Sequence, residues 1–322
     1  MTKYYQNDCG RNSKIPLAHQ MPSVPFQKPP GRRATFHFIA GGTAGFLELV
    51  TFHPLNVIKN RMQLQGDKPF HGEITYHGSM DAIAKMYRYE GLSAFFKGIV
   101  PPICVETPKR GFKFLAYEAI TPHLKFGSPT PTPLTYAMTG ALVGGLESIL
   151  TNPFEVVKIM QQAHREKHLD SMTVVKYTIR KQGFGFKGLY RGFNALVARN
   201  AIFNFGYFGI YNSATHSGTI PEDPIEKFLF KCFLGMFASG VGNFLSLPFD
   251  LAKSRIQGPQ PVKGEIKYRT TIQTLRTTIR EEGVRALFKG LGPSLARAVP
   301  GGALLIVAYE YIYDILIESF AE

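Results

Sequence analysis

The stretch Pro153-Phe154-Glu155-Val156-Val157-Lys158, followed by Gln162, decides the fold because the chain repeats its pattern twice more. In each copy an acidic or polar residue stands two places after a proline, a lysine five places after it and a glutamine nine places after it. The other copies begin at Pro54 and Pro248, so the prolines are 99 and 95 residues apart (153 − 54 and 248 − 153). A second pattern, aromatic-basic-glycine, follows each copy, at Phe96-Lys97-Gly98, Tyr190-Arg191-Gly192 and Phe288-Lys289-Gly290. Self-similarity at a fixed period indicates a repeat architecture, so we expect one body built of three units.

Apolar stretches at two places in each unit predict membrane helices. Residues 35–52, 134–150 and 228–247 precede the prolines, and each stretch is near the roughly 20 residues that a bilayer span needs. More polar stretches follow the glycines, at residues 99–124, 193–211 and 291–317. Six spans of this polarity are compatible with a bilayer when their charges face a watery interior. Short amphipathic segments before Glu90, Gly183 and Glu282 are expected to lie on the membrane surface.

Composition limits the function classes. Lysine and arginine exceed aspartate and glutamate by 37 to 23, and the sequence pI is about 9.6. The basic residues recur at matching positions of the repeats, which disfavours a nucleic-acid footprint and favours anionic lipid or an anionic solute. The residues show no nucleophile with an oriented base, metal spacing or phosphate loop, so we expect neither an enzyme nor a bound metal or cofactor. Residues 1–33 carry six basic residues against Asp8 alone, and their prolines predict a disordered basic tail.

The charged residues after each proline predict a ring of ion pairs. A proline inside a helix kinks it, so three kinks at matching depth would draw three helices together at one end. The acidic position and the lysine three places later share one helical face, where an acid on one helix can pair with a lysine on the next. Such a network, weak in partly wet surroundings, would act as a gate. The expected pairs are Glu155–Lys253, Asp250–Lys59 and Asn56–Lys158, the last without an acid, with Gln63, Gln162 and Gln257 hydrogen-bonding across them.

Equivalent positions of the three repeats also indicate a binding site. The seventh residue after each aromatic-basic-glycine glycine is Val105, Arg199 or Arg297. Two arginines at the same depth predict a ligand with two negative charges, since forked guanidinium donors take carboxylates bidentately. Lys109 and Lys113 lie one and two helical turns beyond Val105, on its face; snorkelling to the membrane interface is the alternative. Asn200, beside Arg199, and Glu106, which can neutralise a neighbouring cation, complete the predicted site.

The aromatic-basic-glycine turns predict lipid sites. Each turn opens a helix whose free N–H groups and dipole favour an anion. A basic side chain next to each turn would then bind cardiolipin phosphate, although a plain capping turn is the alternative. The predicted lipid-binding residues are Lys97, Gly98, Arg191, Gly192, Lys289 and Gly290.

These patterns resemble the signature of the mitochondrial carrier family, Pro-x-acid-x-x-basic followed by aromatic-basic-glycine, over residues 35–318. The resemblance implies a pseudo-threefold carrier bundle of six transmembrane helices and three short matrix helices, acting as a monomer by alternating access across the mitochondrial inner membrane. The repeats would span residues 34–125, 130–216 and 224–318. Asn56 departs from the signature, because the family has an acid there.

The pair Arg199-Asn200 resembles the arginine-polar pair of the family's keto-acid and carboxylate carriers. The segments Glu106-Thr107-Pro108-Lys109-Arg110 and Asn152-Pro153-Phe154-Glu155 resemble that same group. This resemblance implies 2-oxodicarboxylate substrates, with 2-oxoadipate exchanged for 2-oxoglutarate. Another di- or tricarboxylate, such as malate or citrate, is the alternative.

Overall fold

The computed structural model describes residues 31–66, 75–124, 132–164, 169–216, 221, 223–260 and 266–320. Within these ranges the chain forms nine α-helices and three short 3-10 helices, and no strand. Of the predicted tail, residues 1–30 lie outside the described ranges. Residues 31–33 instead begin the first helix.

Each unit consists of a long helix, a short helix and a second long helix. The first long helices, which we call the proline helices, are α1 (Gly31–Leu64), α4 (Pro133–Ala163) and α7 (Pro224–Gln257). The second long helices, which we call the return helices, are α3 (Val100–Ile120), α6 (Phe193–His216) and α9 (Leu291–Phe320). The short helices are α2 (Ser79–Glu90), α5 (Ser171–Gln182) and α8 (Thr271–Glu282), each of 12 residues. All nine coincide with segments that the sequence pattern predicts.

The short helices end at glycines with left-handed backbone. Gly91, Gly183 and Gly283 have φ of 77°, 80° and 81°, a conformation in which a side chain would be strained. Clusters of buried side chains tie α2 and α5 to the proline helices. Under α2 these include Ile58 and Met86. The short helices are therefore fixed near the C-terminal ends of the proline helices.

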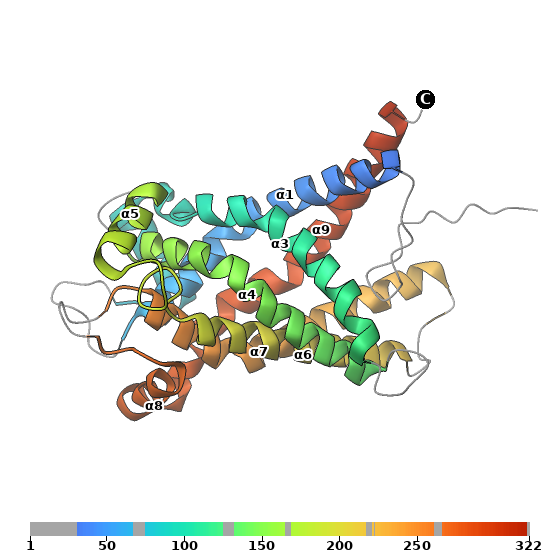
Figure 1. Ribbon diagram of the computed structural model, residues 1–322. Coiled ribbons are helices and arrows are strands. Elements are labelled where there is room, and N and C mark those ends of the chain that lie inside the picture. The colour runs from blue at the N-terminus through green and yellow to red at the C-terminus, as the bar shows by residue number, and fades with distance from the viewer. Residues whose placement is uncertain are drawn as a thin grey trace, which may run out of the picture.

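Long helices pack in sequence around the molecule. Each return helix contacts the proline helix of the following unit: α3 packs on α4, α6 on α7 and α9 on α1. Close approach requires glycine at some contacts, because a Cβ on Gly242 of α7 would lie 3.0 Å from the Phe203 carbonyl of α6. Figure 1 shows α5 and α8 at the same end of the molecule, with the C-terminal end of α9 at the opposite end.

Among the described helices, one stretch, Leu229–Gln257, is long and apolar enough by length and composition to cross a membrane. The remaining long helices carry the polar residues that the sequence pattern assigns to an interior site.

Candidate functional site

The two predicted acid–lysine pairs are present between proline helices. Lys59 Nζ of α1 lies 2.7 Å from Asp250 Oδ2 of α7, and Lys253 Nζ of α7 lies 2.8 Å from Glu155 Oε2 of α4. The Asp250 and Lys253 side chains are almost fully buried. The segments after the three prolines therefore meet, and α7 is joined to both of its neighbours by an ion pair.

The contact expected between Asn56 and Lys158 is replaced by other contacts. Asn56 Oδ1 accepts a hydrogen bond from Arg297 Nη1 at 3.3 Å. Lys158 Nζ lies 3.4 Å from Glu155 Oε1 of its own helix. Helices α1 and α4 are joined instead by Asn60 Nδ2, which donates to Gln162 Oε1. The expected position of Asn56 was wrong because its side chain reaches the return helix α9 rather than the neighbouring proline helix.

The three glutamines do not play one role. Gln63 Nε2 donates to Asp250 Oδ2 at 2.9 Å and so lies across the Lys59 pair, as expected. Gln162 and Gln257 contact turns instead: Gln162 Nε2 donates to the Lys97 carbonyl at 3.3 Å, and Gln257 Nε2 to the Arg191 carbonyl at 3.3 Å. The expectation for these two was wrong, because their amide groups are taken up by these carbonyls and by the asparagines Asn60 and Asn152.

The basic residue of each aromatic-basic-glycine turn points into the protein. Lys97 Nζ donates to the His164 carbonyl at 3.2 Å, Lys289 Nζ to the Gln65 carbonyl at 3.3 Å, and Arg191 Nη2 to the Gln257 carbonyl. Each of these carbonyls belongs to the C-terminal end of the next proline helix, where the helix dipole favours a cation. Their side chains thus join neighbouring units, and the binding of lipid phosphate by these cations stays a prediction.

The glycines of the same turns lie against the next proline helix. Gly98 has φ 71°, and a Cβ on it would stand 3.0 Å from the Lys158 carbonyl. Gly290 has φ 87°, and a Cβ there would stand 3.1 Å from Lys59 Cγ. Both the backbone angle and the close approach therefore require glycine.

Repeats one and three contain a buried network that the sequence analysis missed. Arg255 Nη2 of α7 donates to Glu282 Oε2 of α8 at 2.8 Å, and Lys289 donates to the same carboxylate at 2.6 Å. In repeat one, Arg61, Glu90 and Lys97 form the same arrangement. Repeat two has Met160 and Gln182 at these positions. The sequence did contain a signal for this network. A second basic residue stands two places after the lysine in repeats one and three, and methionine replaces it in repeat two.

The carboxylates of these networks stay ionised. Burial alone would raise the pKa of Glu282, but hydrogen bonds from Arg255 and Lys289 outweigh it and hold the pKa below its ordinary value. The same causes, with Arg61 and Lys97 as donors, lower the pKa of Glu90.

The two predicted binding-site arginines each contact a residue of the ion-pair region. Arg199 Nε lies 3.3 Å from Asp250 Oδ1, while its Nη1 donates to Asn200 Oδ1 at 2.7 Å. Arg297 contacts Asn56, and its Nη2 lies 3.4 Å from Glu48 Oε1. Their side chains are 28% and 42% exposed, so both remain accessible to a solute.

Of the predicted residues of α3, Lys113 reaches α6. Lys109 Nζ lies 2.7 Å from Glu106 Oε2, one turn away on the same helix. Lys113 Nζ donates to Asn204 Oδ1 of α6 at 3.1 Å. Val105 is buried and serves packing. The sequence analysis did not include Glu48 or Asn204 in the site. The signal for Asn204 was its place one helical turn after Asn200, on the same face of the helix.

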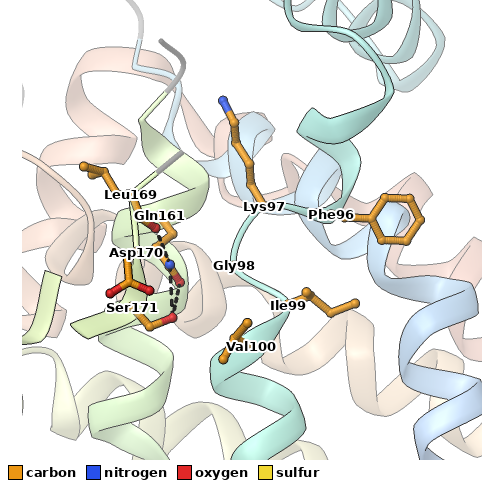
Figure 2. Close-up of a pocket in the computed structure, with 9 residues that line it drawn as sticks. All are labelled: Phe96, Lys97, Gly98, Ile99, Val100, Gln161, Leu169, Asp170 and Ser171. Carbon is orange, nitrogen blue, oxygen red and sulfur yellow. Dashed lines mark hydrogen bonds between the residues drawn. The ribbon is translucent and has the colours of Figure 1, made fainter. Parts of the chain in front are cut away.

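A pocket lies between the turn of repeat one and the start of α5. It is lined by Phe96, Lys97, Gly98, Ile99, Val100, Gln161, Leu169, Asp170 and Ser171. Figure 2 shows the Lys97 side chain extending away from the Asp170 and Ser171 side of this pocket. Asp170 Oδ2 caps α5 by accepting from the N–H groups of Met172 and Thr173 at 3.1 and 3.4 Å. A carboxylate of the chain itself therefore occupies the anion-favouring end of α5.

Three like units, ion pairs that join α7 to α1 and to α4, and two accessible arginines beside those pairs fit a transporter of the three-repeat carrier class. The chain belongs to the mitochondrial carrier family: the sequence model of that family, described as mitochondrial carrier protein, matches residues 32–128, 129–218 and 226–320.

Relatives with named functions cover most of the chain. The mitochondrial 2-oxodicarboxylate carrier of Homo sapiens is 42% identical over 292 residues, which cover 90% of this chain and 97% of that protein. The protein of the same name from Bos taurus is 41% identical, over 93% of this chain and 99% of its own. The mitochondrial 2-oxodicarboxylate carrier 2 of Saccharomyces cerevisiae is 35% identical, over 85% of this chain and 91% of its own.

Proposed function

We propose that the chain is an antiporter of the mitochondrial inner membrane that exchanges 2-oxodicarboxylates, 2-oxoadipate for 2-oxoglutarate, by alternating access. The observation that carries the proposal is the pair of matched arginines: Arg199 and Arg297 occupy the same position in two repeats, and each contacts a residue of the ion-pair region. The names of the relatives support this substrate class.

Substrate binding would act on the gate through these arginines. A carboxylate that binds Arg199 bidentately competes with Asp250 for the same guanidinium. The second carboxylate competes at Arg297 with Asn56 and Glu48. A dianion of the right length therefore weakens contacts on α7 and α1 at once, whereas a monoanion weakens one of them. This difference would favour exchange of dicarboxylates over passage of smaller anions.

Because of Lys109 and Lys113, the site could also accept other substrates, such as citrate or malate. These lysines add two cations on α3, and Glu106 compensates one of them. A tricarboxylate such as citrate would need the third cation, while malate would need only the arginines. The Lys113 ammonium group donates to Asn204 and keeps further N–H groups that could bind a carboxylate.

The six long helices would span the membrane as a monomer, with α2, α5 and α8 on the matrix side. Free N–H groups at the starts of the return helices, next to Gly192 and Gly290, are the groups that would bind cardiolipin phosphate. The site at Gly98 would bind it less well, since the Asp170 carboxylate lies in the same pocket.

Exchange in liposomes tests the function. The purified chain is reconstituted into vesicles preloaded with 2-oxoadipate, malate, citrate, ADP or buffer, and uptake of labelled 2-oxoglutarate is followed. We expect the fastest uptake with 2-oxoadipate inside and background uptake into vesicles without internal substrate. Faster uptake against citrate or malate would retain the transporter and overturn the substrate.

A further inference from the structure

The turn after α5 differs from the turns of the other repeats. From the glycine that ends the short helix to the glycine of the aromatic-basic-glycine pattern there are nine residue steps in repeat two (192 − 183) but seven in repeats one and three (98 − 91 and 290 − 283). The shorter segments form the 3-10 helices η2 (Leu92–Phe96) and η4 (Val284–Phe288). Repeat two therefore has a turn two residues longer than the corresponding turns of repeats one and three.

Aromatic side chains of this turn gather on the surface. Phe184 and Phe186 are 61% and 73% exposed. Both rings contact Tyr190 edge-on, with centroids 5.7 and 6.4 Å apart, and Phe186 also contacts Phe193 at 6.1 Å. Tyr190 itself is tied to α4, since its hydroxyl donates to the Ile149 carbonyl at 3.1 Å. The rings are thus held in place while two of them remain open, as expected for a surface that meets another apolar phase.

The charged residues that neighbour these rings in sequence are all basic. No aspartate or glutamate occurs between Asp170 and Glu222. The other short helices end differently, at Glu90 in α2 and at Glu281 and Glu282 in α8. The exposed basic residues that surround the rings in sequence are Lys176, Arg180, Lys181 and Lys187.

We propose that this aromatic-basic patch, formed by Phe184, Phe186 and the four exposed basic residues, docks onto an anionic lipid surface and anchors repeat two at the membrane interface. Aromatic rings beside lysine and arginine are the composition that inserts at the headgroup boundary, and each basic residue adds attraction to anionic lipid. A nucleic-acid duplex or an acidic protein surface would satisfy the charges but not the open rings. The proposal rests on the membrane placement proposed above, yet it concerns a different surface from the transport site.

Tryptophan fluorescence tests the proposal, because the chain contains no tryptophan. Phe186→Trp in the full-length chain creates a single reporter at the centre of the patch. The variant is reconstituted into phosphatidylcholine vesicles with and without cardiolipin, using phosphatidylcholine with brominated acyl chains as the quencher. We expect emission at short wavelength that loses most of its intensity to the brominated lipid, with the larger loss in cardiolipin-containing vesicles.

Two further variants act as controls. Val284→Trp places the reporter in the shorter turn of repeat three, at a position of similar exposure, 59%, and should show weaker quenching that does not respond to cardiolipin. Lys181→Glu combined with Lys187→Glu, in the Phe186→Trp chain, should remove the response to cardiolipin.

Two results would overturn the proposal. Emission from Phe186→Trp at the wavelength of a water-exposed tryptophan, unaffected by brominated lipid, would show that the patch faces water. Short-wavelength emission without quenching would show that protein, such as a second copy of the chain, covers it. Uptake of 2-oxoglutarate into the same vesicles is measured in parallel, so that loss of transport with retained quenching counts against the transport proposal alone.

Discussion

The contact between α7 and α1 and the contact between α1 and α4 occupy equivalent places in the repeat but are built differently. The first contains the Lys59–Asp250 ion pair, braced by Gln63, together with Arg255, which donates to the Gln63 carbonyl at 3.1 Å. The second keeps the arginine, since Arg61 donates to the Gln162 carbonyl at 3.1 Å, but Asn56 supplies no acid. The three repeats are therefore alike in fold, but the contacts between their proline helices differ in strength.

The contact between α4 and α7 shows a third solution. It has the Glu155–Lys253 pair, yet Met160 stands where α1 and α7 have an arginine. Arg191 takes over the missing contact by donating to the Gln257 carbonyl and to Gln182 Oε1. Each contact between proline helices is therefore held by a different set of groups. Removing one group should change stability and exchange by an amount that depends on the repeat.

Of the substitutions that test this difference between the contacts, Asp250→Asn should have the largest effect on stability and exchange. The substitution leaves Lys59, Lys253 and Arg199 without the carboxylate that they share, and breaking such a buried pair costs about 3 to 5 kcal/mol. We expect a large fall in the melting temperature of the detergent-purified protein and loss of exchange. Asp81→Asn, which removes a half-exposed partner of Lys85 on α2, is the control and should change little. Equal melting temperatures for the two variants would contradict the account.

Glu282→Gln should have the second-largest effect on stability, and the size of that effect should depend on pH. The pKa of Glu282 lies below the ordinary 4.5 in the folded protein, so its stabilisation is complete above that value and is lost as the pH falls through the folded pKa. We expect a loss of about 1 to 3 kcal/mol at neutral pH, because Arg255 stays buried without its charged partner. Thermal unfolding from pH 7 to pH 3 checks this, and the difference from wild type should shrink at the acid end.

Glu281→Gln is the matched control for this series. Glu281 is the neighbouring residue, and its pair with Lys267 is exposed. Its loss should cost less than about 1 kcal/mol. A pH-independent effect of Glu282→Gln, or one no larger than that of Glu281→Gln, would show that the buried network does not stabilise repeat three.

Asn56→Asp should have the smallest effect on stability, and it should stabilise the protein rather than destabilise it. It supplies the acid that the α1–α4 contact lacks, at a position where Asn56 accepts a hydrogen bond from Arg297. We expect a gain of about 1 kcal/mol or less in stability and exchange that is up to about fivefold slower, since a stronger closed state is harder to open. Melting temperature and initial exchange rate check both effects. Faster exchange with a lower melting temperature would mean that this contact does not limit opening.

Helix order and the two acid–lysine pairs followed from the sequence, because residues three places apart share a helical face and the repeat fixes which faces meet. The Asn56 contact with Arg297 did not follow, since the depth and rotation of α9 against α1 decide it and spacing does not encode them. The same holds for Lys97, Arg191 and Lys289. A cation beside a glycine turn can face lipid or a neighbouring helix end, and the packing of units selects the helix end.

In the proposed mechanism, Arg199 and Arg297 bind the substrate and transmit its binding to the gate. Exchange of 2-oxoglutarate by Arg199→Ala and Arg297→Ala, with the exposed Arg276→Ala of α8 as the control, tests it most directly. We expect both site variants to remain folded and to fall to background exchange, while Arg276→Ala exchanges like wild type. Exchange near the wild-type rate in either site variant would contradict the claim.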